Sequence, residues 1–406
     1  MNGATQAVRA GELSRLMLDA TEADAAAAYN LLVAQRVARD IDLGRLAEAL
    51  TRVVRSRAVT RVRVWRAPSG AWMQADSGLE LPPVRVERLA GEGAWSRVRR
   101  EVSSPFPVPG GPYFRVRLVE AEGEGWLFLG FHHAFCDSRS VGALLREVLR
   151  AYDEPAWNPP PDGYFEWAAR DAIETAGPRG EAGRRFWRAQ EFDPCAWPCA
   201  PRLGNVPGET GSAGLRFQLP ISLAALRAAA QEFGVTVNTL LVGALARAIA
   251  VDHGAGRAFL GCVCHARTKG DNRVFGLLFR DLGFAIETDG ENRAYLRRVW
   301  KIVREGIAHR FGSSEGALWR DSEGTGRNIT GMMFSEDPLP PRLFQPDSRA
   351  VYGDAGEAHD ALAIPMYCDG NAVRVEFTYR RETYCAARIA EFRDLFVETL
   401  VGLAGA

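Results

Sequence analysis

The chain has 406 residues, 47% hydrophobic and 25% charged, which is typical of globular proteins and long enough for two substantial domains. Fifty basic residues balance fifty acidic ones, so overall charge gives no support for binding to nucleic acid or anionic lipid. The most apolar helical stretch, 239–251, is shorter than the roughly 20 residues of a membrane span. No signal peptide is evident. We therefore expect a cytoplasmic protein without a membrane segment.

The first half of the chain is predicted to be mixed α/β. A helix is expected after Asp40 or Asp42, over apolar positions between 43 and 54, and alternating residues predict strands near 62–64 and at 114–118. The continuous apolar run 126–131 has the length of a buried strand, and helical spacing follows from Ser140 to about Tyr152. A further helical region is expected to carry Tyr164, Trp167, Phe186 and Trp187.

The second half has the same mixed character. Helices are predicted at 222–233, closed by Gly234, at 238–252 with Thr236 or Asn238 as N-cap, at about 293–309, and at 385–403. Strands are predicted at 258–264, 282–287 and 328–334, with two more in 366–379 joined by a turn at Asp369-Gly370. Residues 190–212 hold four prolines and three glycines without a sustained period. We therefore predict an N-terminal lobe at 1–189, a linker at 190–212 and a C-terminal lobe at 213–406.

The cysteines, the sequence GSSEG and His309 are interpreted as structural features and not as catalytic or metal-binding ones. Seven cysteines, an odd number in a large chain, indicate free thiols. Cys195 and Cys199 lack a second nearby ligand pair, so no metal site is expected. The sequence GSSEG at 312–316 fits a hydrolase nucleophile pattern with Ser314 as nucleophile, but helical spacing precedes it where that motif needs a strand. His309 is interpreted as a helix-end residue.

The sequence FHHAFCDSRS lies between the predicted strand 126–131 and the following helix. Neighbouring side chains on an extended segment point to opposite faces, so only one of His132 and His133 can face a cavity while the other packs inside. Asp137 is either the N-cap of the helix or a buried carboxylate that braces the site. Ser138 could cap the helix instead, which would leave Asp137 for a salt bridge.

Histidine exchanges protons near neutral pH, and a helix N-terminus can stabilise negative charge on a carbonyl oxygen. A base beside an anion site suggests acyl transfer. From spacing alone, the catalytic and the structural interpretation of the histidines are equally open.

HHAFCDS resembles the HHxxxDG motif of the condensation-domain superfamily, which includes the condensation domains of nonribosomal peptide synthetases and related acyltransferases. Other segments follow in the family's order. They are FPVPGGPYFRVRLVE (106–120), YFEWAAR (164–170), RRFW (184–187), GVTVNTLLVGALARAIA, FLGCVCHAR, FGLLFRDLGFAIE and RNITGMMF. The ordered series is more specific than the motif alone.

The resemblance implies an α/β (α+β) fold of two chloramphenicol-acetyltransferase-like lobes, forming a V-shaped pseudo-dimer with the active site in the tunnel between them. His133 would be catalytic and would accept or position the proton of the attacking amine or hydroxyl. His132 and Asp137 would be architectural. Arg267 matches the family arginine that pairs with the motif aspartate and would tie the second lobe to the active-site turn.

Departures from the family pattern bear on the substrate. Ser138 replaces the usual glycine and Arg139 the usual tryptophan, so the pocket is expected to be bulkier and to suit an acidic or polar acceptor. Arg280 and Asp281 stand where the family often has Asn-Thr. We therefore expect Arg139, Arg280 and Asp281 to contact substrate, with Ser138 in a supporting position.

The sequence thus predicts a freestanding condensation enzyme of natural-product (antibiotic) biosynthesis. It would transfer an acyl or aminoacyl group from a carrier-protein thioester to a small amine. No cofactor is expected to be bound, since the donor carries phosphopantetheine, on an acyl or peptidyl carrier protein in trans or on CoA. The alternatives are a CoA-dependent O-acyltransferase and a non-catalytic module that binds carrier proteins. A monomer is expected.

Overall fold

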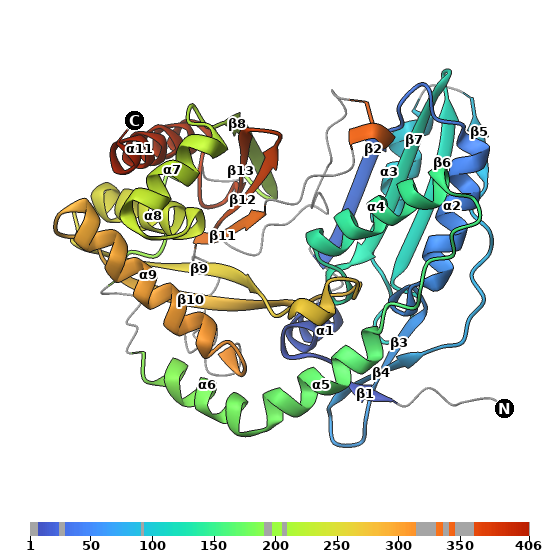
Figure 1. The fold of residues 1–406 in the computed structure, drawn as a ribbon, viewed down its shortest axis with the longest axis horizontal. Helices are drawn as coiled ribbons and strands as arrows, with labels where there is room; N and C mark the ends of the chain where they lie inside the picture. Colours follow the sequence, from blue (N-terminus) through green and yellow to red (C-terminus); the bar gives the residue numbers. More distant parts are fainter. Residues whose placement is uncertain are drawn as a thin grey trace. The chain divides into compact units, whose positions relative to one another are not determined.

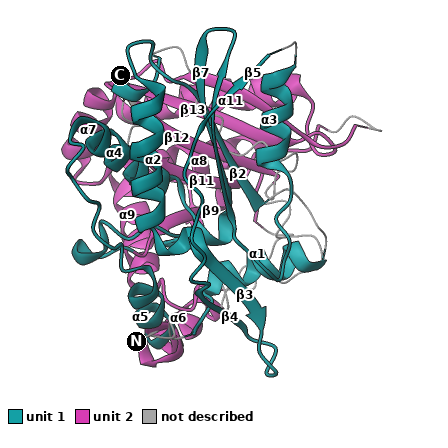
Figure 2. Ribbon diagram, turned by 90° about the vertical axis from the view of Figure 1, so that its right-hand side faces the viewer, with its two compact units in different colours: residues 1–173, 267–279, 339–356 teal, residues 174–266, 280–338, 357–406 magenta. Residues whose placement is uncertain are grey.

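The computed structural model describes residues 7–23, 29–90, 93–190, 197–204, 209–313, 330–335, 341–345 and 361–405. The chain forms two compact units (Figure 2). Unit 1 contains Met1–Ile173, Arg267–Phe279 and Leu339–Gly356; unit 2 contains Glu174–Ala266, Arg280–Pro338 and Glu357–Ala406. This division does not coincide with the predicted lobes 1–189 and 213–406, because residues 174–189 pack with unit 2 and two later segments pack with unit 1. Such long-range packing leaves no local sequence signal.

A four-stranded sheet in the order β2-β7-β6-β5 forms the centre of unit 1. Its strands are β2 (Asn30–Arg36), β5 (Val86–Leu89), β6 (Phe114–Ala121) and β7 (Glu124–His132). β7 pairs antiparallel with β2 and with β6. The predicted apolar strand is therefore an inner strand of this sheet. A smaller sheet has the order β1-β4-β3, with β1 at Val8–Arg9, β3 at Val62–Arg66 and β4 at Trp72–Asp76.

Helices cover the larger sheet because the strands present apolar side chains on both faces. Phe128 of β7 packs with Val98 and Val102 of α3 (Ala94–Ser103), while Leu127 and Leu129 alternate to the opposite face and are also fully buried. The helices α2 (Leu43–Ser56) and α4 (Ser138–Asp153) pack side by side. Asp42 caps α2, as one of the two predicted candidates.

Unit 2 is built on a six-stranded sheet in the order β10-β9-β11-β12-β13-β8. The strands are β8 (Ser212–Gln218), β9 (Arg257–His265), β10 (Phe279–Glu287), β11 (Thr330–Ser335), β12 (Leu362–Asp369) and β13 (Ala372–Arg380). β11 pairs parallel with β9 and β12, and β13 pairs antiparallel with β12 and β8. Asp369 pairs with Ala372, so the hairpin turn is Gly370-Asn371, one residue beyond the predicted one.

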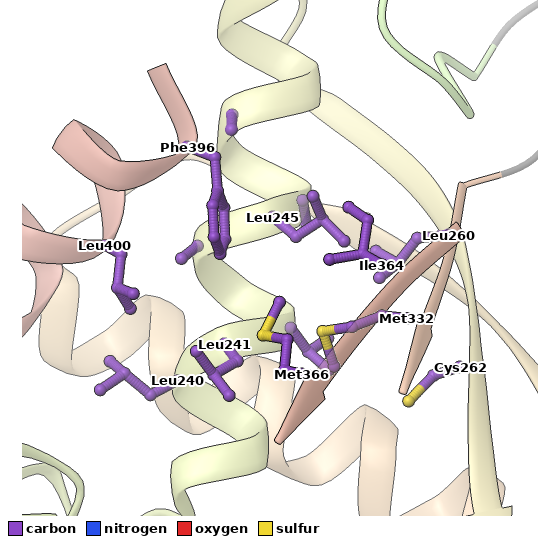
Figure 3. Packing of buried hydrophobic residues seen from close by; sticks show 14 of the residues in the cluster. Leu240, Leu241, Leu245, Leu260, Cys262, Met332, Ile364, Met366, Phe396 and Leu400 are labelled. Carbon is purple, nitrogen blue, oxygen red and sulfur yellow. The ribbon is translucent and has the colours of Figure 1, made fainter. Parts of the chain in front are cut away.

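The helices of unit 2 are α6 (Pro178–Arg188), α7 (Leu223–Phe233), α8 (Val237–His253), α9 (Asn292–Ala308) and α11 (Ala386–Ala404). Thr236 caps α8 and Gly234 ends α7, as predicted. Leu241 and Leu245 of α8 are buried with sheet residues such as Ile364 and with Phe396 of α11 (Figure 3). The helix is buried nearly all round, and it lies beside α9 and α11 (Figure 1).

No single helix in the described ranges is both long and apolar enough to cross a membrane. Only α7 and α8 taken together, bent by 89° at their junction, reach the required length and composition.

Two sequence predictions about connections need correction. The helical region predicted over 164–187 is two helices, α5 (Tyr164–Ala176) and α6, because Gly177 interrupts it and Pro178 starts the next helix. Residues 197–204, predicted as linker, are tied to unit 2. The backbone amides of Phe259 and Thr330 donate to the carbonyls of Pro198 and Cys199. Side chains bind the next three carbonyls: His253 Nε2 donates to Ala200, the Tyr384 hydroxyl to Pro201 and Arg388 Nε to Arg202. A proline-rich sequence fits this role, since it donates few hydrogen bonds of its own.

Candidate functional site

The two histidines lie where β7 ends. His132 is the last residue of the strand, and the chain then makes a short 3-10 turn, His133–Phe135 (η3), before α4 begins at Ser138. Both histidines and Asp137 belong to unit 1. The predicted strand-to-helix junction is thus present, with one extra turn between the two elements.

His132 points into the interior and is fully buried. Its Nδ1 accepts a hydrogen bond from the Ala134 amide at 3.1 Å. The neutral ring therefore carries its proton on Nε2, which donates to Thr21 Oγ1 at 3.1 Å. The rings of Phe106, Tyr113 and Phe135 surround it. Burial, and to a smaller extent the neighbouring His133, lowers the pKa of His132 to about 3, so this ring stays neutral near pH 7.

His133 is only half-buried and is oriented by the backbone. Its Nδ1 lies 2.7 Å from the carbonyl oxygen of Cys136. A carbonyl can only accept, so Nδ1 is the protonated nitrogen and donates to it. The neutral ring therefore keeps its lone pair on Nε2. This is the tautomer that a general base requires on the side of the ring away from the turn.

Asp137 is fully buried and has several partners. Its Oδ1 accepts from the Ser140 amide at 2.7 Å, which makes it the N-cap of α4. Arg267 Nη2 lies 2.9 Å from Oδ1 and 3.0 Å from Oδ2, and the Leu278 amide donates to Oδ2 at 2.9 Å. Asp137 therefore caps the helix and forms the salt bridge at once, so Ser138 is not needed as the cap.

Ser140 joins the same network. Its hydroxyl donates to the Gly276 carbonyl at 2.8 Å and accepts from the Gly276 amide at 3.0 Å and from Arg267 Nη2 at 2.7 Å. Arg267 Nη1 also donates to the Val274 carbonyl at 2.7 Å. Asp137, Ser140 and Arg267 thus bind the segment 274–278 to the start of α4. All of these residues belong to unit 1, so Arg267 packs within the histidine-bearing unit.

The predicted anion site at the N-terminus of α4 is partly used by the protein itself. The Ser140 amide is bonded to the Asp137 carboxylate, and the Val141 amide makes the first helical bond, to the Asp137 carbonyl. These two amides are not available to a substrate oxygen.

The other predicted residues lie in different places. Ser138 and Arg139 are half-buried in the first turn of α4, beside His133 in sequence. Arg280 and Asp281 lie on β10 in unit 2, and these residues are 1% and 8% exposed. Their contact with substrate stays a prediction.

Three polar residues that support the turn were missed from the sequence: Ser14, Thr21 and Ser140. Ser14 Oγ donates to the Ala134 carbonyl at 2.7 Å. Ser14 and Thr21 lie on α1 (Glu12–Ala23), for which no helix was predicted. Ser14 and Thr21 fall on the same face as the apolar residues Leu13, Met17 and Leu18, and that pattern is the signal that could have revealed them.

Other candidate chemistry finds no support. Six cysteines, at 136, 199, 262, 264, 368 and 385, are free, as predicted. Burial raises the pKa of the Cys136 thiol well above its usual value, which disfavours a reactive thiolate beside His133. No group of three potential metal ligands gathers among the described residues, and Cys195 and Ser314 lie outside them. His309 caps the end of α9, as predicted.

A groove of about 690 Å³ lies on unit 1, lined by Val62–Trp65, Ser77, Leu79 and Gly110–Pro112. None of the motif residues lines it. It is separate from the histidine turn.

The fold and the turn together define a two-unit α/β protein with one buried and one half-buried histidine braced by an Asp–Arg pair. The family described as "Condensation domain" matches residues 15–313. The chain belongs to this family. The predicted family and α/β fold class are thus confirmed.

Related proteins and solved structures agree with this family assignment. The chain is 23% identical over 418 residues to the phosphinothricin tripeptide synthetase PhsB of Streptomyces viridochromogenes, covering 92% of this chain and 34% of the relative. It is 28% identical over 289 residues to the nonribosomal peptide synthetase otaB of Aspergillus niger, covering 67% of this chain and 14% of the relative. The chain thus spans about a third of the first relative's length and about a seventh of the second's.

Two solved structures cover nearly all of the chain. The condensation domain of the monacolin K polyketide synthase MokA superposes with a TM-score of 0.82 at 14% identity, covering 100% of this chain and 98% of the other. The first condensation domain of the calcium-dependent antibiotic synthetase, in complex with a substrate analogue, gives 0.77 at 18% identity, covering 99% and 97%. At these identities the likeness establishes the fold.

Proposed function

We propose that this protein transfers an acyl or aminoacyl group from a carrier-protein thioester to a small amine in natural-product biosynthesis, with His133 as the base. The observation that carries the proposal is the hydrogen bond from His133 Nδ1 to the Cys136 carbonyl. It leaves Nε2 as the basic nitrogen of a half-buried ring in a chain of the condensation-domain family.

In the proposed reaction, the amine nitrogen attacks the thioester carbonyl while Nε2 of His133 accepts the proton that the amine loses. The C–N bond forms, the C–S bond breaks, and the thiol of the phosphopantetheine arm leaves with the proton returned from His133. A base held in one tautomer can act without first turning its ring. His132, neutral and enclosed, has no direct part in these steps.

The other residues have supporting roles in the proposal. Asp137 and Arg267 hold the residues just after the turn, including Cys136, whose carbonyl orients His133. Arg139, beside Ser138, would favour an acceptor that carries an acidic or polar group.

The direct test supplies the purified protein with acyl and aminoacyl thioesters on a separate carrier protein and on CoA. Panels of amines and alcohols serve as acceptors, and mass spectrometry reads the products. We expect amide formation from the carrier-bound donor. The His133→Ala variant should be slower by roughly 100- to 10,000-fold. His253→Ala is the matched control, because His253 is an exposed histidine of unit 2.

Three outcomes would contradict parts of the proposal. Equal turnover by wild type and His133→Ala would remove His133 as the base. Ester products that form only when the acceptor is an alcohol and the donor is an acyl-CoA thioester would favour the O-acyltransferase. Carrier-protein binding without any turnover by the folded wild type would favour a non-catalytic module.

A further inference from the structure

The helix α1 touches the histidine turn at two points. Ser14 donates to the Ala134 carbonyl inside the 3-10 turn, and Thr21 accepts from His132 just before it. The two residues are seven positions apart, which is two helical turns, so they lie on the same face of α1. Both are nearly fully buried, with 5% and 6% of their surface exposed.

The hydrogen bonds of Thr21 fix the direction of each proton. Ala134 donates to His132 Nδ1, so Nε2 must donate to Thr21 Oγ1. The Thr21 hydroxyl then donates its own proton to the Met17 carbonyl, 2.8 Å away within α1. The chain of bonds from the Ala134 amide to the Met17 carbonyl has one consistent arrangement. It fixes the tautomer and ring orientation of His132.

The residue between these two contacts is His133. Its backbone is held on one side by His132, through Thr21, and on the other by Ala134, through Ser14. The Cys136 amide also bonds to the His133 carbonyl, which closes the turn. A shift of either anchored residue would move the His133 ring relative to a bound substrate.

We infer that Ser14 and Thr21 are positioning residues, which act through Ala134 and His132 to hold the His133 ring in its reactive place. The inference deepens the proposed function and rests on it for its kinetic consequence. Its structural part, the control of the His132 tautomer by Thr21, stands without any turnover.

The structural part is tested by nitrogen NMR of protein labelled at its six histidines. In wild type, His132 should show a neutral ring with the proton on Nε2, unchanged between pH 8 and 5, because its pKa is lowered to about 3. Thr21→Val removes the acceptor of that proton while nearly keeping the shape of the side chain. We expect the Nε2 signal to shift, and Thr21→Ser to restore it. Unchanged His132 signals in Thr21→Val would overturn the inference.

The kinetic part uses the same variants in the amide-forming assay. Thr21→Val and Ser14→Ala should each lower kcat by roughly ten- to a hundred-fold and leave KM within about two-fold, because the reacting group is displaced and substrate binding is not. Thr21→Ser should recover most of kcat. Thr399→Val is the matched control, since Thr399 makes the same bond to the fourth preceding carbonyl, in α11 of unit 2.

The outcomes separate the two proposals. An inactive wild type whose His132 signals respond to Thr21→Val would refute the proposed function and leave the positioning by α1 standing. An active wild type whose kcat is unaffected by both Thr21→Val and Ser14→Ala would refute the positioning role. Because Thr21→Val removes a buried hydrogen bond, Ser14→Ala provides a second variant at an independent contact.

Discussion

A single nitrogen of Arg267, Nη2, contacts both carboxylate oxygens of Asp137, at 2.9 and 3.0 Å, although 130 positions separate the two residues. The other terminal nitrogen binds the Val274 carbonyl, so the guanidinium joins two parts of unit 1. The two side chains are 4% and 0% exposed. Removing one partner would leave a buried charge without compensation.

We predict that Arg267→Ala lowers the free energy of unfolding by about 3 to 5 kcal/mol, the usual cost of leaving a buried carboxylate unpaired. Denaturant titration measures it. Arg185→Ala is the control, because Arg185 and Glu181 are 68% and 64% exposed in their ion pair, and its loss should cost no more than about 1 kcal/mol. Equal losses in the two variants would contradict the argument from burial.

Ser140→Ala should destabilise the protein by about 1 to 3 kcal/mol, because the buried amide and carbonyl of Gly276 lose their shared partner. Ser56→Ala, which loses one half-buried bond to the Val53 carbonyl in α2, should cost about 1 kcal/mol or less. Thermal or denaturant unfolding of the pair gives the comparison. If Ser140→Ala lowers the free energy of unfolding no more than Ser56→Ala does, the three hydrogen bonds of the Ser140 hydroxyl contribute little to stability.

The stability of the protein should depend on His132 below neutral pH. Its pKa is about 3 in the folded state and about 6.5 when unfolded, so the unfolded chain binds more protons between these values and stability falls as pH decreases. Between pH 7 and 5, wild type should lose about 2 kcal/mol more unfolding free energy than His132→Gln. If the unfolding free energies of wild type and His132→Gln change with pH in parallel, the His132 ring is not buried in its neutral form.

Gly130 is predicted to tolerate no side chain. A Cβ there would lie 2.5 Å from the Val102 carbonyl and 2.8 Å from Val102 Cγ1, so α3 would have to move away from β7. Gly130→Ala should cost about 1 to 3 kcal/mol. Gly402→Ala in α11, where nothing lies within 4 Å, should instead stabilise by up to about 1 kcal/mol. The two substitutions should thus shift the melting temperature in opposite directions. A higher melting temperature in Gly130→Ala would contradict the predicted clash with α3.

The sequence predicted best where one element shows a clear period. The strand ending at His132 and the helix after it follow from apolar runs and spacing, and Thr236 and Gly234 mark helix ends by their own chemistry. The helix α1 escaped detection because Ser14 and Thr21 occupy part of its buried face. Their burial is explained by partners, Ala134 and His132, that lie more than a hundred positions away.

The same limit applies to the site. Burial of one histidine and exposure of the next follows from strand alternation, but which of the two is buried came from the family resemblance. The pairing of Asp137 with Arg267 also came from the resemblance, because spacing says nothing about residues so far apart. The sequence also did not indicate that residues 197–204 are held in a defined structure. The groups that donate hydrogen bonds to them come from four other regions of the chain.

The distance along the chain between Asp137 and Arg267 has a consequence for synthesis on the ribosome. When residue 137 leaves the exit tunnel, the partners of its carboxylate at 267 and 278 have not yet been made. At about 5 to 20 residues per second, the wait lasts roughly 7 to 28 seconds. The histidine turn therefore reaches its final form only after the Glu174–Ala266 segment of unit 2 has emerged, and a nascent chain stalled before residue 267 should present a protease-sensitive turn.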